Sequence, residues 1–594
     1  MKSKTSFYVQ HLHIFNLPLV LLLKLFGNVY VFKYRGLCQR FLKSNFIPSI
    51  NDFEDVDHWR RLKEYTFQTL KSKFSFVEES SLSGKIKNLT YKGDKLFLQA
   101  FFKDFEQYIF LVHLAKSDCE NPIILGSSFT HYLRIAHPQL LEIHASFDFP
   151  FSALDSLYSY LQNIVIFLKQ IIKLFYIKKD PFNYGHFKYL FTGISLVEYP
   201  TSEATLNFAW PVANDVVRAD EALFILDVKP DQKTRAFLAK KKINFVTRRT
   251  LMNSLSFYER VSIGFNTFFS LFYFGSFYKK NFLSACHLHN RVWYSIFKRI
   301  DPAYFCFSFS SGWPEPNEIA IANSLNIKTI NWFYGTSEFG YTNSYSSFTD
   351  DNVRFCVREA REFWVWNTVI KDLIVKRSFI PSENHIEVVG PILNGNWNLL
   401  NQPPKKKVPF RIAFFDITPM KPRMRLQYGE GPYCNAEMQD KIYRSILKIH
   451  ETFRDIEIVI KTKRAENYAI YEAQPTLTHL LNANLDRVTF LPANSDPYLA
   501  IKDADLVVST PYTSPSILAL SLGQKGIFYD PTRTAKCTFK DAFKNLTVYS
   551  EDELISLISN VISGKDDIHS RHNHDFFPRV KPAQITSNLI SRLK

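Results

Sequence analysis

The feature that most constrains the fold of this chain is the segment Asp505–Asp530, which reads DLVVSTPYTSPSILALSLGQKGIFYD. Its pattern predicts a buried strand over Asp505–Ser509, a hydroxyl-rich turn, a short apolar helix that Gly523 ends, and a second strand over Lys525–Tyr529. In a parallel sheet, such a unit brings the carboxyl end of the strand and the N-terminus of the helix to the same edge. The segment therefore predicts an α/β domain.

The turn within this segment has the chemistry of a phosphate site. Ser514 is expected to cap the helix, and Pro515 suits the first helical position because its missing N–H costs nothing there. Unpaired N–H groups and the helix dipole attract anions at such a terminus. The residues expected to bring hydroxyl groups to the anion are Ser509, Thr510, Thr513, Ser514 and Ser516. The pattern alone fits a capped helix without a ligand equally well, so the choice between the two interpretations depends on the residues predicted to lie near the turn.

Charged residues at two other strand ends support the phosphate interpretation. The stretch DIEIVIKTKR, residues 455–464, predicts a strand that ends near Lys461, with Lys463 just beyond it. Asp416 follows the predicted strand Arg411–Phe415, where it either contacts a donor molecule or caps the next turn. Because the carboxyl ends of parallel strands meet at one edge, we expect the lysines and the hydroxyl-rich turn to converge on one anion.

The composition narrows the choice of partners. The chain has 73 Lys and Arg against 56 Asp and Glu, a net charge of +17, which favours anionic partners such as phosphorylated metabolites, acidic glycans or a membrane surface. It has no zinc-finger, homeodomain or RRM pattern, so nucleic acid is not an expected partner. No metal site is expected either, because the seven cysteines form no CxxC pair and Asp503-Ala504-Asp505 lies at the amino end of its strand.

Two apolar segments raise the question of contact with lipid. Val261–Tyr278 carries no charge and lies between Arg260 and the pair Lys279–Lys280, while Leu161–Ile177 has a helical apolar pattern with lysines on one stripe. Ser, Asn and Gly residues make Val261–Tyr278 a poor membrane span, so it is either a buried core helix or an interfacial helix whose flanking cations meet anionic lipid. We expect a cytoplasmic protein bound peripherally to the inner face of the cytoplasmic membrane.

Strands and helices alternate in two halves of the chain. Residues 1–400 are expected to form an N-terminal Rossmann-like domain, opened by a helix and the strand Asn28–Tyr34, with a Phe-rich insertion at about 150–290. The stretch NQPPKKKVP, residues 401–409, is the predicted linker, and residues 410–594 form the C-terminal domain. The fold class is α/β, with two Rossmann-like doubly wound domains that face each other across a cleft.

These residues resemble a known family. The stretch Arg411–Asp530 is similar to GT-B glycosyltransferases, and Pro511-Tyr512-Thr513-Ser514 resembles the motif of the polysaccharide-biosynthesis family named for Pro-Phe-Thr-Ser. The resemblance implies a GT-B fold, a nucleotide-sugar donor bound by the C-terminal domain, and a glycan or lipid-linked acceptor of a growing cell-surface polysaccharide. The distant resemblance to bacterial sialyltransferases implies a CMP-linked donor with a nonulosonic acid or Kdo-type sugar, but their His-Pro pair is replaced here by Lys461-Thr462-Lys463.

The resemblance also implies a type of chemistry. GT-B enzymes hold the leaving phosphate with helix dipoles and side chains, so we expect a metal-independent, inverting transferase with no cofactor besides its donor substrate. The general base is expected in the amino-terminal half, where Glu315 and Glu338 follow predicted strands. One alternative is a non-catalytic GT-B-like protein that binds lipid or glycan within a polysaccharide assembly complex, and another is a sugar-nucleotide epimerase on the same fold.

Overall fold

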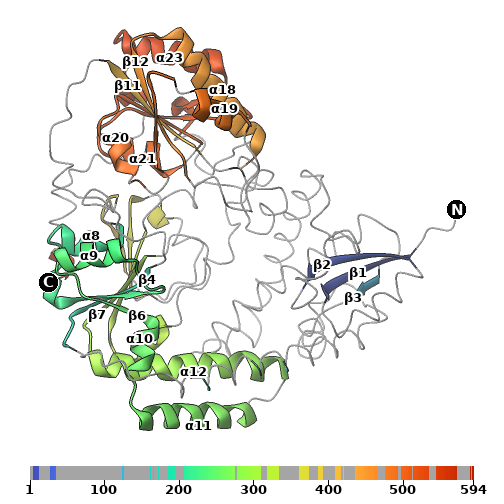
Figure 1. Ribbon diagram of the computed structural model, residues 1–594, viewed down its shortest axis with the longest axis vertical. Coiled ribbons are helices and arrows are strands. Elements are labelled where there is room, and N and C mark those ends of the chain that lie inside the picture. The colour runs from blue at the N-terminus through green and yellow to red at the C-terminus, as the bar shows by residue number, and fades with distance from the viewer. Residues whose placement is uncertain are drawn as a thin grey trace. The chain divides into compact units, whose positions relative to one another are not determined.

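The computed structural model describes much of the chain from residue 185 onward, and short parts before it (Figure 1). The described residues are 5–12, 27–34, 123–125, 185–194, 207–273, 277–308, 318–333, 360–372, 385–391, 409–416, 435–463, 475–533 and 543–571, with gaps of one or two residues, and isolated positions within 161–172, at 419 and within 589–593. The chain divides into two units, residues 1–182 with 252–298, and residues 183–251 with 299–594.

A small parallel sheet lies near the N-terminus. Its strands are β1 (Thr5–Leu12), β2 (Gly27–Tyr34) and β3 (Ile123–Leu125), in the order β2-β1-β3. The strand expected at Asn28–Tyr34 is therefore confirmed, but it belongs to this separate sheet and not to the larger sheet that begins near residue 189.

The second sheet has seven parallel strands in the order β10-β9-β8-β7-β4-β5-β6. Along the chain, β4 to β6 run toward one side of the sheet, and the chain then returns to place β7 to β10 on the other side, so the order reverses between β4 and β7. The sequence predicts a Phe-rich insertion at about 150–290, yet residues 189–247 supply three of these strands. The strands are β4 (Tyr189–Ile194), β5 (Ala222–Leu226), β6 (Phe245–Thr247), β7 (Tyr304–Ser308), β8 (Lys328–Trp332), β9 (Glu362–Val365) and β10 (His385–Val388).

Aromatic side chains fill the core around this sheet. All five residues of β5 are buried, as befits a strand covered on both faces. The rings of Phe191 and Phe224 stack with centroids 4.6 Å apart, and Phe191 also packs against Trp332. Helix α9 (Gln232–Lys240) begins where the Asp231 carboxylate accepts a 2.7 Å hydrogen bond from the Thr234 N–H. The high phenylalanine content thus serves, at least here, to build a core.

The third sheet has six parallel strands in the order β13-β12-β11-β14-β15-β16. Its order reverses between β11 and β14, which repeats the doubly wound topology of the seven-stranded sheet. The strands are β11 (Phe410–Phe415), β12 (Ile456–Lys461), β13 (Val488–Leu491), β14 (Leu506–Ser509), β15 (Gly526–Tyr529) and β16 (Thr547–Val548). The α/β class with two Rossmann-like sheets is therefore confirmed, while the predicted cleft between the two domains stays a prediction.

Helices cover both faces of the six-stranded sheet (Figure 1). They are α18 (Ala436–Thr452), α19 (Pro475–Ala483), α20 (Pro497–Lys502), α21 (Ser514–Ser521) and α23 (Glu551–Ile562). The side chain of Asn435 caps α18 through the Met438 N–H at 2.6 Å, and Ser550 caps α23. The predicted linker lies between β10 and β11, and residues 401–408 are outside the described residues.

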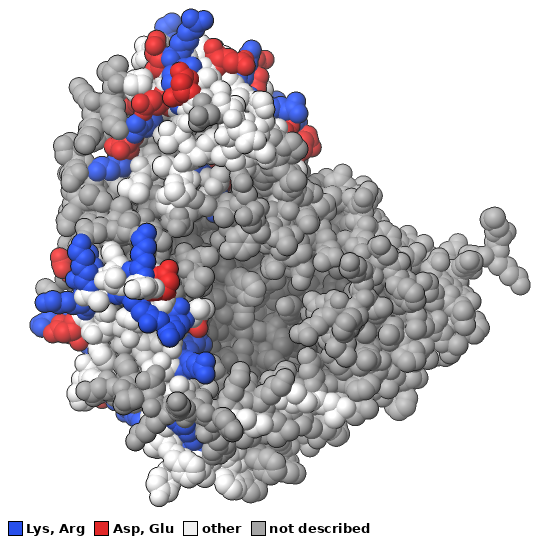
Figure 2. Space-filling view, in the orientation of Figure 1, with Lys and Arg blue, Asp and Glu red and all other residues white. Residues whose placement is uncertain are grey.

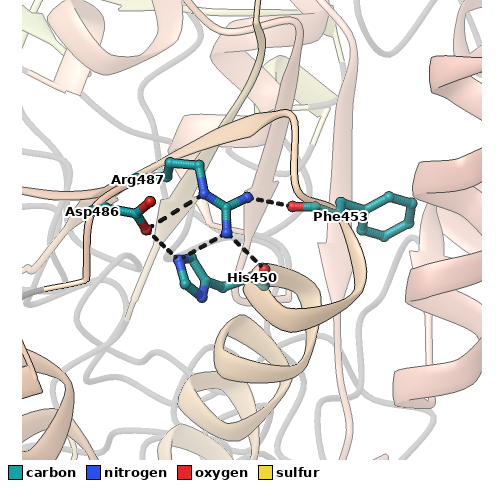
Figure 3. A network of polar contacts seen from close by, with 4 residues as sticks. All are labelled: His450, Phe453, Asp486 and Arg487. Atoms are coloured by element: carbon teal, nitrogen blue, oxygen red, sulfur yellow. Dashed lines mark hydrogen bonds and ion pairs between the residues drawn. The ribbon is translucent and has the colours of Figure 1, made fainter.

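Arg487 fastens the end of α18 at the amino edge of this sheet (Figure 3). Its guanidinium donates to the carbonyl oxygens of Phe453, at 2.6 Å, and of His450, at 3.2 Å, which the helix leaves without an intrahelical partner. Asp486 lies beside both, 3.1 Å from His450 Nε2 and 3.5 Å from Arg487 Nε. These polar residues lie at the edge opposite the strand ends that carry function in this topology, so we interpret them as structural.

The last residues of the chain contact the seven-stranded sheet. The Tyr189 hydroxyl donates to the Leu593 carbonyl at 2.5 Å, and Arg592 forms a 2.7 Å ion pair with Glu387. Both large sheets accordingly belong to one unit of the chain. A fragment that contains only the C-terminal sheet would lose these contacts.

The uncharged segment Val261–Tyr278 does not form one helix. It begins inside α11 (Phe257–Tyr273) and ends inside α12 (Phe277–Ile300). Among the helices that the structure describes, none is long and apolar enough to cross a bilayer. Arg260, the cation before this segment, is buried and donates to the carbonyl oxygens of Leu255 and Asn253, which at this end of the segment fits the core alternative better than the interfacial one.

Candidate functional site

Three strand ends meet where the order of the six-stranded sheet reverses. In the register of the sheet, Phe415 at the end of β11 pairs with Lys461 of β12 on one side and with Ser509 of β14 on the other. The Thr510 N–H donates to the Phe415 carbonyl at 3.2 Å, which brings the hydroxyl-rich turn beside Asp416. The predicted convergence of these residues is therefore present, at the place where open α/β sheets bind ligands.

Asp416 is buried and braces the strand ends around it. One carboxylate oxygen accepts hydrogen bonds from the Tyr443 hydroxyl, at 2.6 Å, and the Gln439 amide, at 2.7 Å, and the other accepts from the Lys463 N–H at 2.6 Å. Burial raises the pKa of Asp416, and the three hydrogen bonds and the charge of Lys461 oppose that rise. With both oxygens engaged, Asp416 positions its neighbours, which is closer to the predicted capping role than to direct contact with a donor.

The two predicted lysines differ in exposure. Lys461 is the last residue of β12 and is buried, and its ammonium group donates to the Thr462 carbonyl at 3.3 Å. Lys463 is exposed, and its backbone is held by Asp416. Lys463 therefore has the freer access to a ligand, whereas Lys461 supplies a positive charge from within the edge of the sheet.

The start of α21 differs from the prediction by one residue. Thr513, and not Ser514, is the N-cap residue, and Ser514 and Pro515 form the first turn. The Thr513 side chain makes no capping hydrogen bond, because its hydroxyl donates instead to the Thr510 carbonyl at 2.8 Å. The Thr513 hydroxyl thus stabilises the turn before the helix, and the N-terminus of α21 has no capping hydrogen bond from the side chain of its N-cap residue.

Ser509 and Ser516 lie inside the domain. The Ser509 hydroxyl donates to Ser516 Oγ at 2.7 Å, and the Ser516 hydroxyl donates to the Ile527 carbonyl at 2.6 Å. Both side chains are buried, so this relay joins β14, α21 and β15. The sequence predicts donor contacts from these two serines, whereas the structure uses their hydroxyl groups to join elements of the fold.

Gly526 permits the close packing of α21 on β15. A Cβ atom at this position would lie 2.7 Å from the Ser516 carbonyl oxygen and 3.2 to 3.3 Å from the side chains of Leu520 and Ala519. Gly523 has a different role, because its φ of +78° ends the helix in the left-handed conformation, as predicted.

A further cation, which the sequence analysis missed, follows β15. Asp530 is fully buried and its carboxylate accepts a 3.1 Å hydrogen bond from Thr532. Arg533 comes next with a φ of +53°, unusual for a residue with a side chain, and its exposed guanidinium lies 5.5 Å from the centre of the Tyr549 ring. A repeated sequence signal could have pointed to Arg533. The strand at 410–415 ends in FFD at 414–416 and the strand at 526–529 ends in FYD at 528–530, so the residues after both reach the same edge of the sheet.

Several predicted features lie outside this site. Glu315 and Glu338, the expected general bases, are outside the described residues, as is Tyr512 of the motif. The Asp503-Ala504-Asp505 sequence is at the amino edge, where Asp505 accepts a 2.7 Å hydrogen bond from the Arg411 N–H. No cluster of three or more potential metal ligands occurs within the described part of the chain.

Residues 275–558 match the model of the family described as polysaccharide biosynthesis PFTS motif protein, which confirms the resemblance drawn from the Pro511-Tyr512-Thr513-Ser514 motif. No curated protein matches the sequence.

Solved structures with similar folds include the UDP-GlcNAc 2-epimerase of Neisseria meningitidis bound to UDP-GlcNAc, at 12% identity over 68% of this chain and 99% of that chain, with a TM-score of 0.38. Anabaena HepE in complex with UDP and glucose has 12% identity over 69% and 99%, with a TM-score of 0.39. A variant of the wall teichoic acid polymerase TagF has 8% identity over 74% and 97%, with a TM-score of 0.39.

Proposed function

We propose that this protein is a glycosyltransferase of polysaccharide biosynthesis that moves a sugar from a nucleotide-linked donor onto a cell-surface polysaccharide or glycolipid acceptor. The family match supports the pathway, and the edge of the six-stranded sheet supports the reaction. The single observation that carries the proposal is the convergence of Lys461 and the start of α21 on the point where the strand order reverses.

The proposed chemistry needs stabilisation of a leaving phosphate. When the bond between the sugar and the phosphate breaks, negative charge develops on the phosphate oxygens. The N-terminus of α21, the hydroxyl group of Ser514 and the ammonium group of Lys463 would bind that charge. The buried ammonium group of Lys461 would add a positive charge close by, whereas the Thr513 hydroxyl is already donated to the Thr510 carbonyl. These donors form the basis of a metal-independent mechanism, and we propose that transfer inverts the anomeric configuration.

The donor nucleotide is best found by thermal shift on the full-length protein. We expect one of the CMP-, UDP-, GDP- and CDP-linked sugars to protect it, with the CMP-linked nonulosonic acid and Kdo donors tested first. A ligand at a hundred times its Kd stabilises the folded state by about 2.7 kcal/mol, a shift that this assay detects. Turnover is then measured by chromatography, as the amount of free nucleotide released from the nucleotide sugar that protects the protein.

Variants at the phosphate site test the assignment. Lys461→Met keeps much of the buried chain but removes its charge, and Ser514→Asp places a negative charge where the phosphate would bind. Both should abolish protection by the donor, whereas Lys565→Ala, an exposed control after α23, should not. Full protection in both site variants would show that the donor binds elsewhere, and protection by no nucleotide sugar would favour the non-catalytic alternative.

We also propose that the protein associates with anionic membrane surfaces. Lys233, Arg235 and Lys240 are exposed on α9, and Figure 2 shows Lys and Arg gathered over that side of the seven-stranded sheet. On α11, Tyr258 is 84% exposed and Phe265 is 62% exposed, on the same face of the helix. Aromatic and basic surfaces of this kind suit lipid headgroups, so the protein should sediment with phosphatidylserine vesicles and be released by salt.

A further inference from the structure

The seven-stranded sheet carries a second polar cluster where its own order reverses. Thr192 lies near the end of β4, Asp227 directly follows β5, and Arg248 directly follows β6 as the first residue of α10 (Arg248–Asn253). Glu318 is the first residue of α13 (Glu318–Ser324), the next described element after β7. Thr192 and Glu318 thus belong to or follow the two strands, β4 and β7, between which the order reverses and beside which such sheets bind ligands, and Asp227 and Arg248 follow the next two strands on one side.

One arginine holds the cluster together. Arg248 Nε lies 2.6 Å from Asp227 Oδ1, and Arg248 Nη1 lies 2.9 Å from Glu318 Oε1. Its Nη2 atom lies 3.4 Å from the Thr192 hydroxyl. Thr192 is 56 residues and Glu318 is 70 residues away from Arg248 in the sequence, yet both contact the same guanidinium.

The two carboxylates differ in their access to solvent. The Glu318 side chain is 2% exposed, whereas that of Asp227 is 37% exposed. Within the described part of the chain, Arg248 is the only ion-pair or hydrogen-bond partner of the Asp227 carboxylate. Glu318 therefore anchors the arginine from the interior, while Asp227 presents a carboxylate to any ligand at this edge.

The exposed carboxylate of Asp227 suggests the kind of ligand. A carboxylate oxygen accepts hydrogen bonds, so it suits a neutral group that donates one, such as a sugar hydroxyl. Burial raises the pKa of Asp227, the charge of Arg248 opposes the rise, and that of Glu318 adds to it. A carboxylate with a raised pKa is a stronger base than an ordinary aspartate.

The backbone of β4 is irregular at the same place. The pairing of β4 with β5 shifts register between Phe191 and Ile194, and Gly193 has a φ of +78°. Bulges of this kind are frequent beside active sites because they redirect side chains at the end of a strand.

We propose that Asp227 is the general base of the transfer reaction, and that Arg248 and Glu318 position it. The inference rests on the proposed function: the acceptor hydroxyl gives its proton to an Asp227 oxygen, the acceptor oxygen bonds to the anomeric carbon of the nucleotide sugar, and the bond to the leaving phosphate breaks with its electron pair on the phosphate. Water can replace the acceptor in the same step, which makes slow donor hydrolysis measurable without a known acceptor.

The decisive variant is Asp227→Asn, compared with wild type in the hydrolysis of the nucleotide sugar that gives the largest thermal shift. We expect a loss of about 10²- to 10⁴-fold in kcat, while protection by the donor is unchanged. In wild type, kcat/KM should rise as the pH passes the raised pKa of Asp227, whose charged neighbours are Arg248 and Glu318. The Asp227→Asn variant should not show this rise of kcat/KM with pH. Asp220→Asn, which opens the exposed Arg218 ion pair near the amino end of β5, is the matched control and should behave as wild type.

A second variant distinguishes a loss of catalysis from a loss of folding. Asp227→Glu keeps the negative charge beside Arg248 but moves the carboxylate by one methylene, so it should melt near wild type and lose at least tenfold in kcat. Hydrolysis by Asp227→Asn within a factor of three of wild type overturns the inference and leaves the proposed function intact. Wild-type protein that turns over none of the donors overturns the proposed function, and this inference falls with it.

Discussion

The contact between α21 and β15 can be tested by a single methyl group. In the variant Gly526→Ala, the new Cβ atom would lie 2.7 Å from the Ser516 carbonyl oxygen, 3.2 Å from Leu520 Cγ and 3.3 Å from Ala519 Cβ. All three neighbours belong to α21 and the nearest is a backbone atom, so the whole helix must move. Overpacking of this kind costs about 1 to 3 kcal/mol.

Hydrogen exchange followed by mass spectrometry measures this cost locally. Exchange through opening of the α21–β15 contact should accelerate by about a factor of ten for each 1.4 kcal/mol, so a loss of about 2 kcal/mol gives about 30-fold. The acceleration should appear in peptides that cover residues 514–529 and not in the seven-stranded sheet.

The matched control is Gly185→Ala. There the new Cβ atom would meet only ring atoms of Phe187, at an ordinary 3.5 Å, so exchange should stay as in wild type. If Gly526→Ala exchanged within a factor of two of wild type over residues 514–529, α21 would not press on β15 as described, and the position assigned to the start of that helix would lose its support.

Three other changes test separate parts of the molecule. Arg487→Ala removes the donor to the last carbonyl groups of α18, and since that side chain is 23% exposed we expect a loss of about 1 kcal/mol, seen as faster exchange at the end of α18. Because burial raises the pKa of Asp416, its contribution to stability is fully present below the unfolded pKa and is lost as pH rises through the folded pKa. The free energy of unfolding of wild type relative to Asp416→Asn should therefore fall from acid toward neutral pH, and a flat difference would refute the assignment. The double variant Tyr258→Ala and Phe265→Ala should bind anionic vesicles at least tenfold more weakly at an unchanged melting temperature, because both side chains are exposed.

Local patterns in the sequence determined the elements of the C-terminal half. The apolar run before Thr510, the glycine at 523 and the apolar run before Asp530 predict β14, α21 and β15 to within one residue. These signals are local, because an apolar run shows which stretch is buried and a glycine marks where a helix can turn left-handed. The same reasoning correctly placed Asp416, Lys461 and the hydroxyl-rich turn at one edge of a sheet.

Tertiary structure decided what each side chain does at that edge. A serine in the sequence is a potential donor to a ligand, but the Ser516 hydroxyl lies against the Ile527 carbonyl and is consumed there. In the same way, Asp416 has both oxygens occupied by Tyr443, Gln439 and the backbone of Lys463. Burial and competing partners come from segments distant in the sequence, so no local pattern contains them.

The cluster around Arg248 shows most plainly which contacts a sequence pattern cannot predict. The strand before Asp227 ends in FILD, a signature shared with the FFD and FYD endings of the other sheet, so the aspartate could have been found from the sequence. Its pairing with Arg248 and Glu318 could not, because β5, β6 and α13 become neighbours only through the strand order of the sheet. Local sequence is thus enough to say which residues stand at the carboxyl ends of strands. Which of those residues meet depends on the strand order, and packing across the whole sheet sets that order.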